Sequence, residues 1–174
     1  MQNEGITFFE HQRLGKKFLF FVFIPIDILF LFGCYYQLIR GIPWGNNPFP
    51  DSGLIITTII MLLITVNMLW INMETVINNE GIRVNVRLLP FYTKTKTFYW
   101  EDISQVYIRK YSPVWEYGGW GIRHGIGKIA YIMSGNIGLQ LILQNNKKVL
   151  IGTNNHEELF EVLQKLGKAE EKPA

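Results

Sequence analysis

The chain has 174 residues, of which 48% are hydrophobic, and its formal net charge is only +3. This balance excludes the concentrated basic surface of a nucleic-acid-binding protein, so we expect no nucleic-acid partner. The single cysteine, Cys34, excludes an intrachain disulfide and any metal site that needs two cysteines. The length leaves room for two membrane spans and one folded domain of about 100 residues.

Two long apolar segments, Lys17–Phe32 and Leu54–Ile71, dominate the first 72 residues. The second segment has no charged residue in 18 positions. Because a hydrocarbon core about 30 Å thick needs roughly 20 apolar helical residues, each segment is long enough to cross a bilayer. We therefore predict a transmembrane hairpin over residues 16–72, with helices at about 17–38 and 53–72 and an external connector at 39–52.

Charges beside the spans predict the orientation of the hairpin, because basic flanks stay in the cytoplasm. Five basic residues lie close to the two spans on the side of the termini: Arg13, Lys16, Lys17, Arg83 and Arg87. The connector at 39–52 holds one Arg and one Asp. We expect a multi-pass protein of the cytoplasmic (inner) membrane, with both termini and the segment 1–15 in the cytoplasm.

Two polar residues, Asp27 and Asn67, fall inside the predicted spans. A carboxylate at mid-span costs about 2.5–3.5 kcal/mol on insertion scales, which the apolar residues around it outweigh. We favour a protonated Asp27 that hydrogen-bonds Asn67 or a threonine of the second span. The alternative is a functional acid. The run Leu31–Cys34 resembles a lipoprotein cleavage box, but Phe32 is bulky for one, so we expect Cys34 to be a small apolar residue of the span.

From Met73 onward the sequence changes to short alternating runs, which are typical of β-strands. Ile82–Leu88 shows a clear period of two, with apolar residues on one face and polar residues on the other. About seven such runs, closely spaced, predict an antiparallel barrel or sandwich. Asn155–Glu158 then fits a capping box before a helix with one apolar stripe. We predict a domain over 73–168 that this helix closes, and a disordered tail over 169–174.

This arrangement resembles bacterial membrane proteins in which two transmembrane helices precede a pleckstrin-homology-like (PH-like) domain. The resemblance rests on the turn Asn79–Ile82, on Tyr99–Ile103 followed by Val106–Tyr107, and on the closing helix. It implies an α+β membrane protein with a bent barrel plugged by its last helix, no enzymatic chemistry and no cofactor. Eukaryotic relatives of the fold often bind phosphoinositides through basic residues in the first hairpin loop. Asn78–Gly81 has no basic residue, so we do not expect that mode of binding here.

Residues 112–128, which we call the Gly/Trp segment, are unlike the rest of the chain, with five glycines in the ten residues 118–127. Phosphate-loop and dinucleotide-loop patterns fail, because Ile122 and His124 stand where glycines are required. Tryptophan and arginine among glycines are typical of interaction hot spots. The candidate binding residues are Trp115, Glu116, Tyr117, Gly118, Gly119, Trp120, Gly121 and Arg123.

Three interpretations of the Gly/Trp segment stay open: a bulged connection whose aromatics cover the barrel, a recognition loop, or a catalytic loop using Glu116 and His124. Neither a nucleophile nor a second carboxylate accompanies that pair, and the histidines show no metal-ligand spacing. We therefore expect a binding or assembly module without catalysis, engaging a protein or a lipid headgroup. The alternative is a small transport or channel component that uses Asp27 in oligomerised hairpins.

Overall fold

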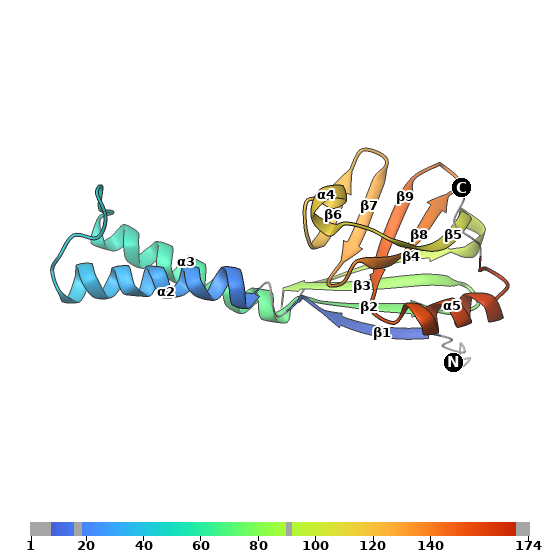
Figure 1. Cartoon of the computed structure of the whole chain (residues 1–174), viewed down its shortest axis with the longest axis horizontal. Coiled ribbons are helices and arrows are strands. Elements are labelled where there is room, and N and C mark those ends of the chain that lie inside the picture. The colour runs from blue at the N-terminus through green and yellow to red at the C-terminus, as the bar shows by residue number, and fades with distance from the viewer. Residues whose placement is uncertain (1–7, 16–18, 90–91, 170–174) are drawn as a thin grey trace. The chain divides into compact units, whose positions relative to one another are not determined.

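The computed structural model describes residues 8–15, 19–89 and 92–169 (Figure 1). It divides into two units, which are described separately: a folded unit built from residues 1–14 and 71–174, and an apolar hairpin of residues 15–70. Most of the predicted tail over 169–174 and the start of the predicted first helix lie outside the described residues.

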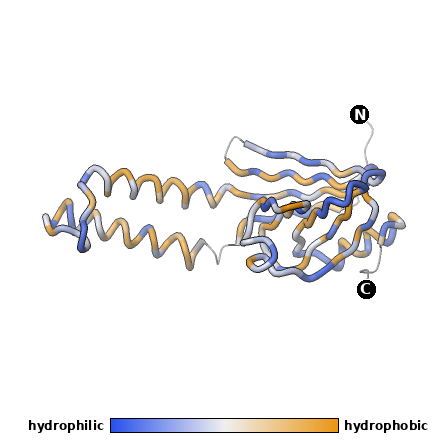
Figure 2. The backbone as a smooth tube through the Cα atoms, turned by 90° about the horizontal axis from the view of Figure 1, so that it is seen from above, coloured by the Kyte–Doolittle hydropathy of each residue, from blue (hydrophilic) through white to orange (hydrophobic). Residues whose placement is uncertain are grey.

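The apolar hairpin contains two helical stretches, whose candidate spans, Phe20–Ile39 and Asp51–Trp70, are each 20 residues long. The first combines the π-helical turn η1 (Leu19–Phe23), α2 (Ile24–Cys34) and the π-helical turn η2 (Tyr35–Ile39), and the second is α3 (Asp51–Trp70). Hydrophobic residues run along most of both stretches (Figure 2). By length and composition, each is able to cross a membrane. The second helix begins two residues earlier than predicted. It also ends two residues earlier, because Asn72 already belongs to a strand.

The connector between the helices is an ordered turn organised by the side chain of Gln37. Its Nε2 atom donates to the carbonyl oxygen of Phe49 and to Oδ1 of Asp51, both at 2.7 Å, and its Oε1 atom accepts from the amide of Trp44 at 3.3 Å. The Trp44 ring lies directly against Gly33, where a Cβ atom would be 2.6 Å from the ring. Only glycine leaves room for this ring in α2.

The sequence predicts an antiparallel barrel or sandwich, and the described part of the folded unit contains two sheets and not a closed barrel. The first has the order β1–β2–β3–β4 and is antiparallel throughout. The second has the order β5–β8–β9–β7–β6, in which the β7–β9 pair is parallel. The strands of the first sheet are β1 (Phe8–Arg13), β2 (Asn72–Ile77), β3 (Gly81–Leu89) and β4 (Tyr92–Tyr99). Those of the second are β5 (Ile103–Lys110), β6 (Gly121–Gly125), β7 (Lys128–Ile132), β8 (Ile137–Leu143) and β9 (Lys148–Thr153).

The strand β1 was not expected from the sequence. It lies before the apolar hairpin and pairs with β2, which lies after it, so that Phe8 faces Ile77 and Arg13 faces Asn72. Together with β6, which forms inside the Gly/Trp segment, it raises the strand number of the described residues above the predicted seven. The folded unit is therefore discontinuous in sequence, and the hairpin is an insertion between two neighbouring strands.

The last helix, α5 (His156–Lys165), is present as predicted and packs its apolar stripe into the core. Its predicted capping box is wrong, because the side chain of Asn155 makes no cap hydrogen bond. The main cluster draws on both sheets and α5. Its fully buried side chains include Met73, Ile77, Ile82, Val84, Val86, Met133, Leu139, Leu141, Ile151 and Leu163.

Buried polar side chains of β1 join it to the second sheet. The carboxylate of Glu10 is only 4% exposed and accepts from the Thr153 hydroxyl and the Asn154 amide, both at 2.7 Å. Two residues along, Gln12 Nε2 donates to the carbonyl oxygen of Gly152 at 2.7 Å. A buried carboxylate is tolerated only when it is hydrogen-bonded, and here its partners lie at the end of β9. These bonds hold the first strand in place.

We predict that Glu10→Ala lowers the free energy of unfolding of the folded unit by about 1–3 kcal/mol, because the buried Thr153 hydroxyl and the amide of Asn154 lose their acceptor. Chemical denaturation of the full chain in detergent, followed by tryptophan fluorescence, measures this change. The matched control is His11→Ala, on the outward face of the same strand, where the residue makes one surface ion pair with Glu74 at 3.5 Å. Equal unfolding midpoints for the two variants would contradict the role of Glu10.

Candidate functional site

The Gly/Trp segment folds into a short helix followed by a hairpin, not into an irregular loop. Helix α4 (Pro113–Tyr117) starts at Ser112, whose hydroxyl accepts from the amide of Trp115 at 3.4 Å. Proline suits the first helical position, because its missing N–H would have no partner there. Gly118 ends the helix in a left-handed conformation with φ of 72°, the conformation that favours glycine. The residues flanking the helix thus explain where it begins and ends.

An ion pair holds α4 to strand β5. Arg109 Nη2 donates to Glu116 Oε2 at 2.8 Å and to the Tyr117 hydroxyl at 3.0 Å. The other carboxylate oxygen of Glu116 accepts from the backbone amide of Ser112 at 2.8 Å. Both oxygens of Glu116 therefore have partners inside the segment and its neighbouring strand.

A second contact holds α4 to the hairpin of β6 and β7. Lys128 Nζ donates to the carbonyl oxygen of Glu116 at 2.9 Å and lies 5.1 Å from the centre of the Tyr117 ring. Lys128 begins β7 directly after the two-residue turn Ile126–Gly127. The helix is thus fixed from two sides, by β5 and by the start of β7.

The charged and phenolic groups around α4 have shifted pKa values. The hydrogen bond from Arg109 lowers the pKa of Glu116 below its ordinary value, so this carboxylate stays ionised at a lower pH than a free one. Burial raises the pKa of Tyr111 to about 12 and also raises the pKa of Tyr117. All three shifts lead away from neutral pH, so these groups are not tuned to exchange protons near pH 7.

The structure separates the two tryptophans of the segment. Trp120 is half-buried and packs on a small cluster, whereas Trp115 is 91% exposed. Val114 beside it is 51% exposed, and Ile126 at the hairpin turn is fully exposed. We call Val114, Trp115 and Ile126 the apolar patch. The cluster under Trp120 consists of Tyr111, Ala130, Ile132 and Leu150.

The remaining predicted residues shape the segment. Gly118, Gly119 and Gly121 all have positive φ, which lets the chain turn from α4 into β6. Arg123 is exposed on β6, with its guanidinium beside Gly119. Four residues of the site were not among the predicted binding residues: Arg109 and Lys128, which hold the helix, and Val114 and Ile126, which extend the exposed surface. The sequence did offer one indication of Ile126, because it is an isolated isoleucine between two glycines.

In the apolar hairpin, Asp27 is buried, with 7% of its surface exposed. Among the described residues its Oδ1 atom has no hydrogen-bond partner, so this atom does not make the expected bond to Asn67 or to a threonine of the second span. The nearby polar contact between the helices joins Cys34 Sγ to the Thr58 hydroxyl at 3.2 Å. Asp27 and the Gly/Trp segment belong to different units.

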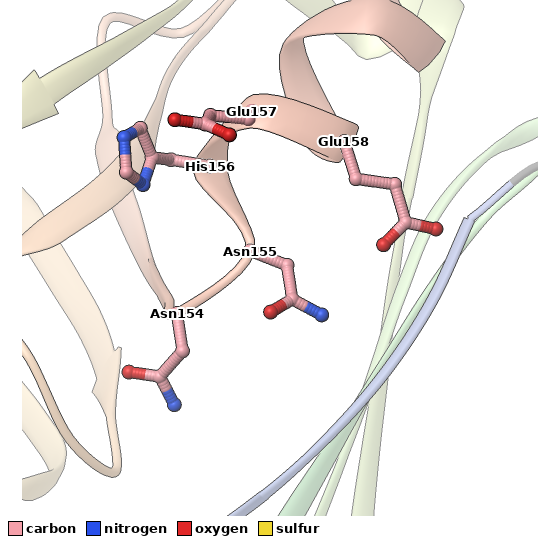
Figure 3. Close-up of a pocket in the computed structure, with 5 residues that line it drawn as sticks. All are labelled: Asn154, Asn155, His156, Glu157 and Glu158. Atoms are coloured by element: carbon pink, nitrogen blue, oxygen red, sulfur yellow. The ribbon is translucent and has the colours of Figure 1, made fainter.

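A pocket of about 430 Å³ at the start of α5 does not assemble a site. Its lining side chains fan out in different directions and do not converge on one point (Figure 3). Asn154 is held by Ser134, with an Nδ2–Oγ distance of 2.8 Å. Within the described part of the chain, no group of three or more His, Cys, Asp or Glu residues could hold a metal ion.

Comparison of the sequence with models of known protein families gives no match. Comparison with curated proteins also gives no match. These comparisons therefore assign the chain to no family, and the structure shows a mixed α+β fold of two sheets and a closing helix.

The two tryptophans are predicted to differ sharply in their effect on stability. Trp120→Ala should lower the free energy of unfolding by roughly 1–3 kcal/mol, because it uncovers the cluster around Tyr111. Trp115→Ala should change it by less than about 0.5 kcal/mol, as is usual at an exposed position. Denaturation of each full-length variant in detergent measures both changes. Comparable losses for the two variants would show that Trp115 is packed.

Proposed function

We propose that the chain is a membrane-anchored binding module that presents the apolar patch as its recognition surface and carries out no catalysis. The observation behind this proposal is the exposure of Trp115 on a helix that is fixed from two sides. A large aromatic side chain that is almost fully exposed on a helix held in place by its neighbours is characteristic of an interaction hot spot. In this proposal the folded unit is PH-like.

We further propose that the apolar hairpin spans the cytoplasmic (inner) membrane of a bacterium twice, with the folded unit on the cytoplasmic side. The length and composition of both helical stretches support this placement. The pairing of β1 with β2 requires both ends of the hairpin to return to the same folded unit, which agrees with an even number of crossings. Arg13 and Arg87, close to those ends, agree with a cytoplasmic location.

The proposal is tested by a photo-crosslinking amino acid placed at position 115 of the full chain in intact membranes. We expect specific adducts at this position, because the side chain there faces outward. The matched control carries the same amino acid at Phe160, an apolar residue of α5 that is also exposed, at 44%. The double variant Val114→Ser with Ile126→Ser should greatly reduce the adducts at 115. Equal adducts at 115 and 160, or none at 115, would contradict the proposal.

A second function, as a small transport or channel component, is favoured by one observation. Asp27 is buried in the apolar hairpin, and its Oδ1 atom has no partner among the described residues. An acid in a membrane span is a candidate for proton or ion movement.

If the chain is a binding module, Asp27→Asn should leave membrane insertion and the adducts at position 115 unchanged, because the two features lie in separate units. Proteoliposomes containing the wild-type chain or this variant should also dissipate an imposed pH gradient at the same rate as empty vesicles. Faster dissipation by the wild type, lost in Asp27→Asn, would support transport instead.

A further inference from the structure

The apolar patch lies in a part of the chain that carries basic residues and almost no acidic ones. Between Glu116 and Glu157 there is no acidic residue, while four basic ones occur: Arg123, Lys128, Lys147 and Lys148. Glu116 itself is paired with Arg109 and does not offset this charge at the surface. The stretch of sequence that carries Ile126 is therefore positively charged.

Sheet pairing brings these basic residues together around the turn that carries Ile126. Lys128 and Lys148 are register partners in the parallel β7–β9 pair, and the amide of Lys148 donates to the carbonyl oxygen of Gly127 at 2.9 Å. Lys147 precedes Lys148, and the side chains of all three lysines are exposed. We call Lys147 and Lys148 the basic rim, because Lys128 Nζ is already bound to α4. The fully exposed Ile126 thus lies at a turn whose next residue, Gly127, is hydrogen-bonded to the backbone of Lys148.

We propose that this surface docks on an anionic lipid bilayer, with Trp115 and Ile126 entering the interface and the basic rim contacting lipid phosphates. This inference deepens the proposed function, on which it rests, by naming the ligand of the apolar patch. Tryptophan favours the headgroup region of a bilayer, and lysines close to an anionic surface are attracted to it. The basic loop that eukaryotic PH-like relatives use is not involved, since Asn78–Gly81 lacks basic residues.

The chain connections favour a bilayer over other occupants. Residues 15–18 alone separate the folded unit from the first helical stretch, and the unit resumes at Ile71, directly after α3, so a hairpin in the membrane would tether the unit close to the bilayer. Such tethering gives a high effective concentration, so a few inserting side chains are sufficient for docking. A symmetric contact with a second copy is disfavoured, because it would bring two basic rims together.

The test uses the full chain with Cys34→Ser and Ile126→Cys, which carries a nitroxide label, in nanodiscs. The discs contain phosphatidylcholine alone or phosphatidylcholine with phosphatidylglycerol, and the depth of the label is read from its relative accessibility to oxygen and to a water-soluble nickel chelate. We expect a membrane-embedded label in the anionic discs and an aqueous one in the neutral discs. The control label at Gln164→Cys, exposed on α5, should stay aqueous in both.

The charge dependence is tested with Lys147→Gln and Lys148→Gln, which leave the contact of Lys128 with α4 intact. Each substitution should weaken docking on anionic discs by about fivefold, and added salt should reverse docking. An aqueous label at 126 in both kinds of disc would overturn the lipid inference. If crosslinking at position 115 then yields adducts to a protein, the apolar patch is still a recognition surface, but its ligand is a protein and not a lipid. If it yields none, the proposed function fails as well.

Discussion

The pairing of β1 with β2 is the constraint on which the rest of the structure depends. Six residues before the apolar hairpin align with six residues after it, and the buried Glu10 and Gln12 connect this pair to the second sheet. Because the two partners are separated by the whole hairpin, the folded unit is complete only when both ends of the hairpin return to it. In the proposed topology, the same pairing makes the two crossings of the membrane and the completion of the sheet interdependent.

Contacts from the second sheet hold the helix α4 in place. Arg109 from β5 and Lys128 from β7 hold it through Glu116 and Tyr117, while Trp120 covers the cluster below the segment. These contacts use the polar groups of the segment internally. Its exposed apolar side chains, with Trp115 foremost, contribute little to the stability of the unit and are available to a ligand. Some residues of the segment hold α4 in place, and others are exposed. The binding proposal and the lipid inference both rest on the exposed ones.

Sequence reasoning predicted both apolar helices from their length and continuous hydrophobicity, and it predicted the strand-rich region and the closing helix from their hydrophobic periods. It missed β1, where the inward positions after Phe8 are the polar Glu10 and Gln12, so that alternation in hydropathy is weak. Strand pairing across the hairpin is also invisible to local patterns. Within the Gly/Trp segment the composition indicated an interaction site, but composition does not reveal which tryptophan is covered. That difference depends on the packing of Trp120 against a cluster whose members, Tyr111, Ala130, Ile132 and Leu150, come from separate parts of the chain.

The pairing across the hairpin is tested most directly by disulfide formation in the full chain in membranes, with Cys34→Ser as background. His11 and Glu74 are register partners whose side chains lie within 3.5 Å, so His11→Cys with Glu74→Cys should oxidise readily. The control pair, His11→Cys with Asn85→Cys, lies two strands apart, beyond the reach of a disulfide. Efficient bonding of the first pair alone is the predicted result. Equal yields for both pairs, or no bond between positions 11 and 74, would contradict the discontinuous sheet.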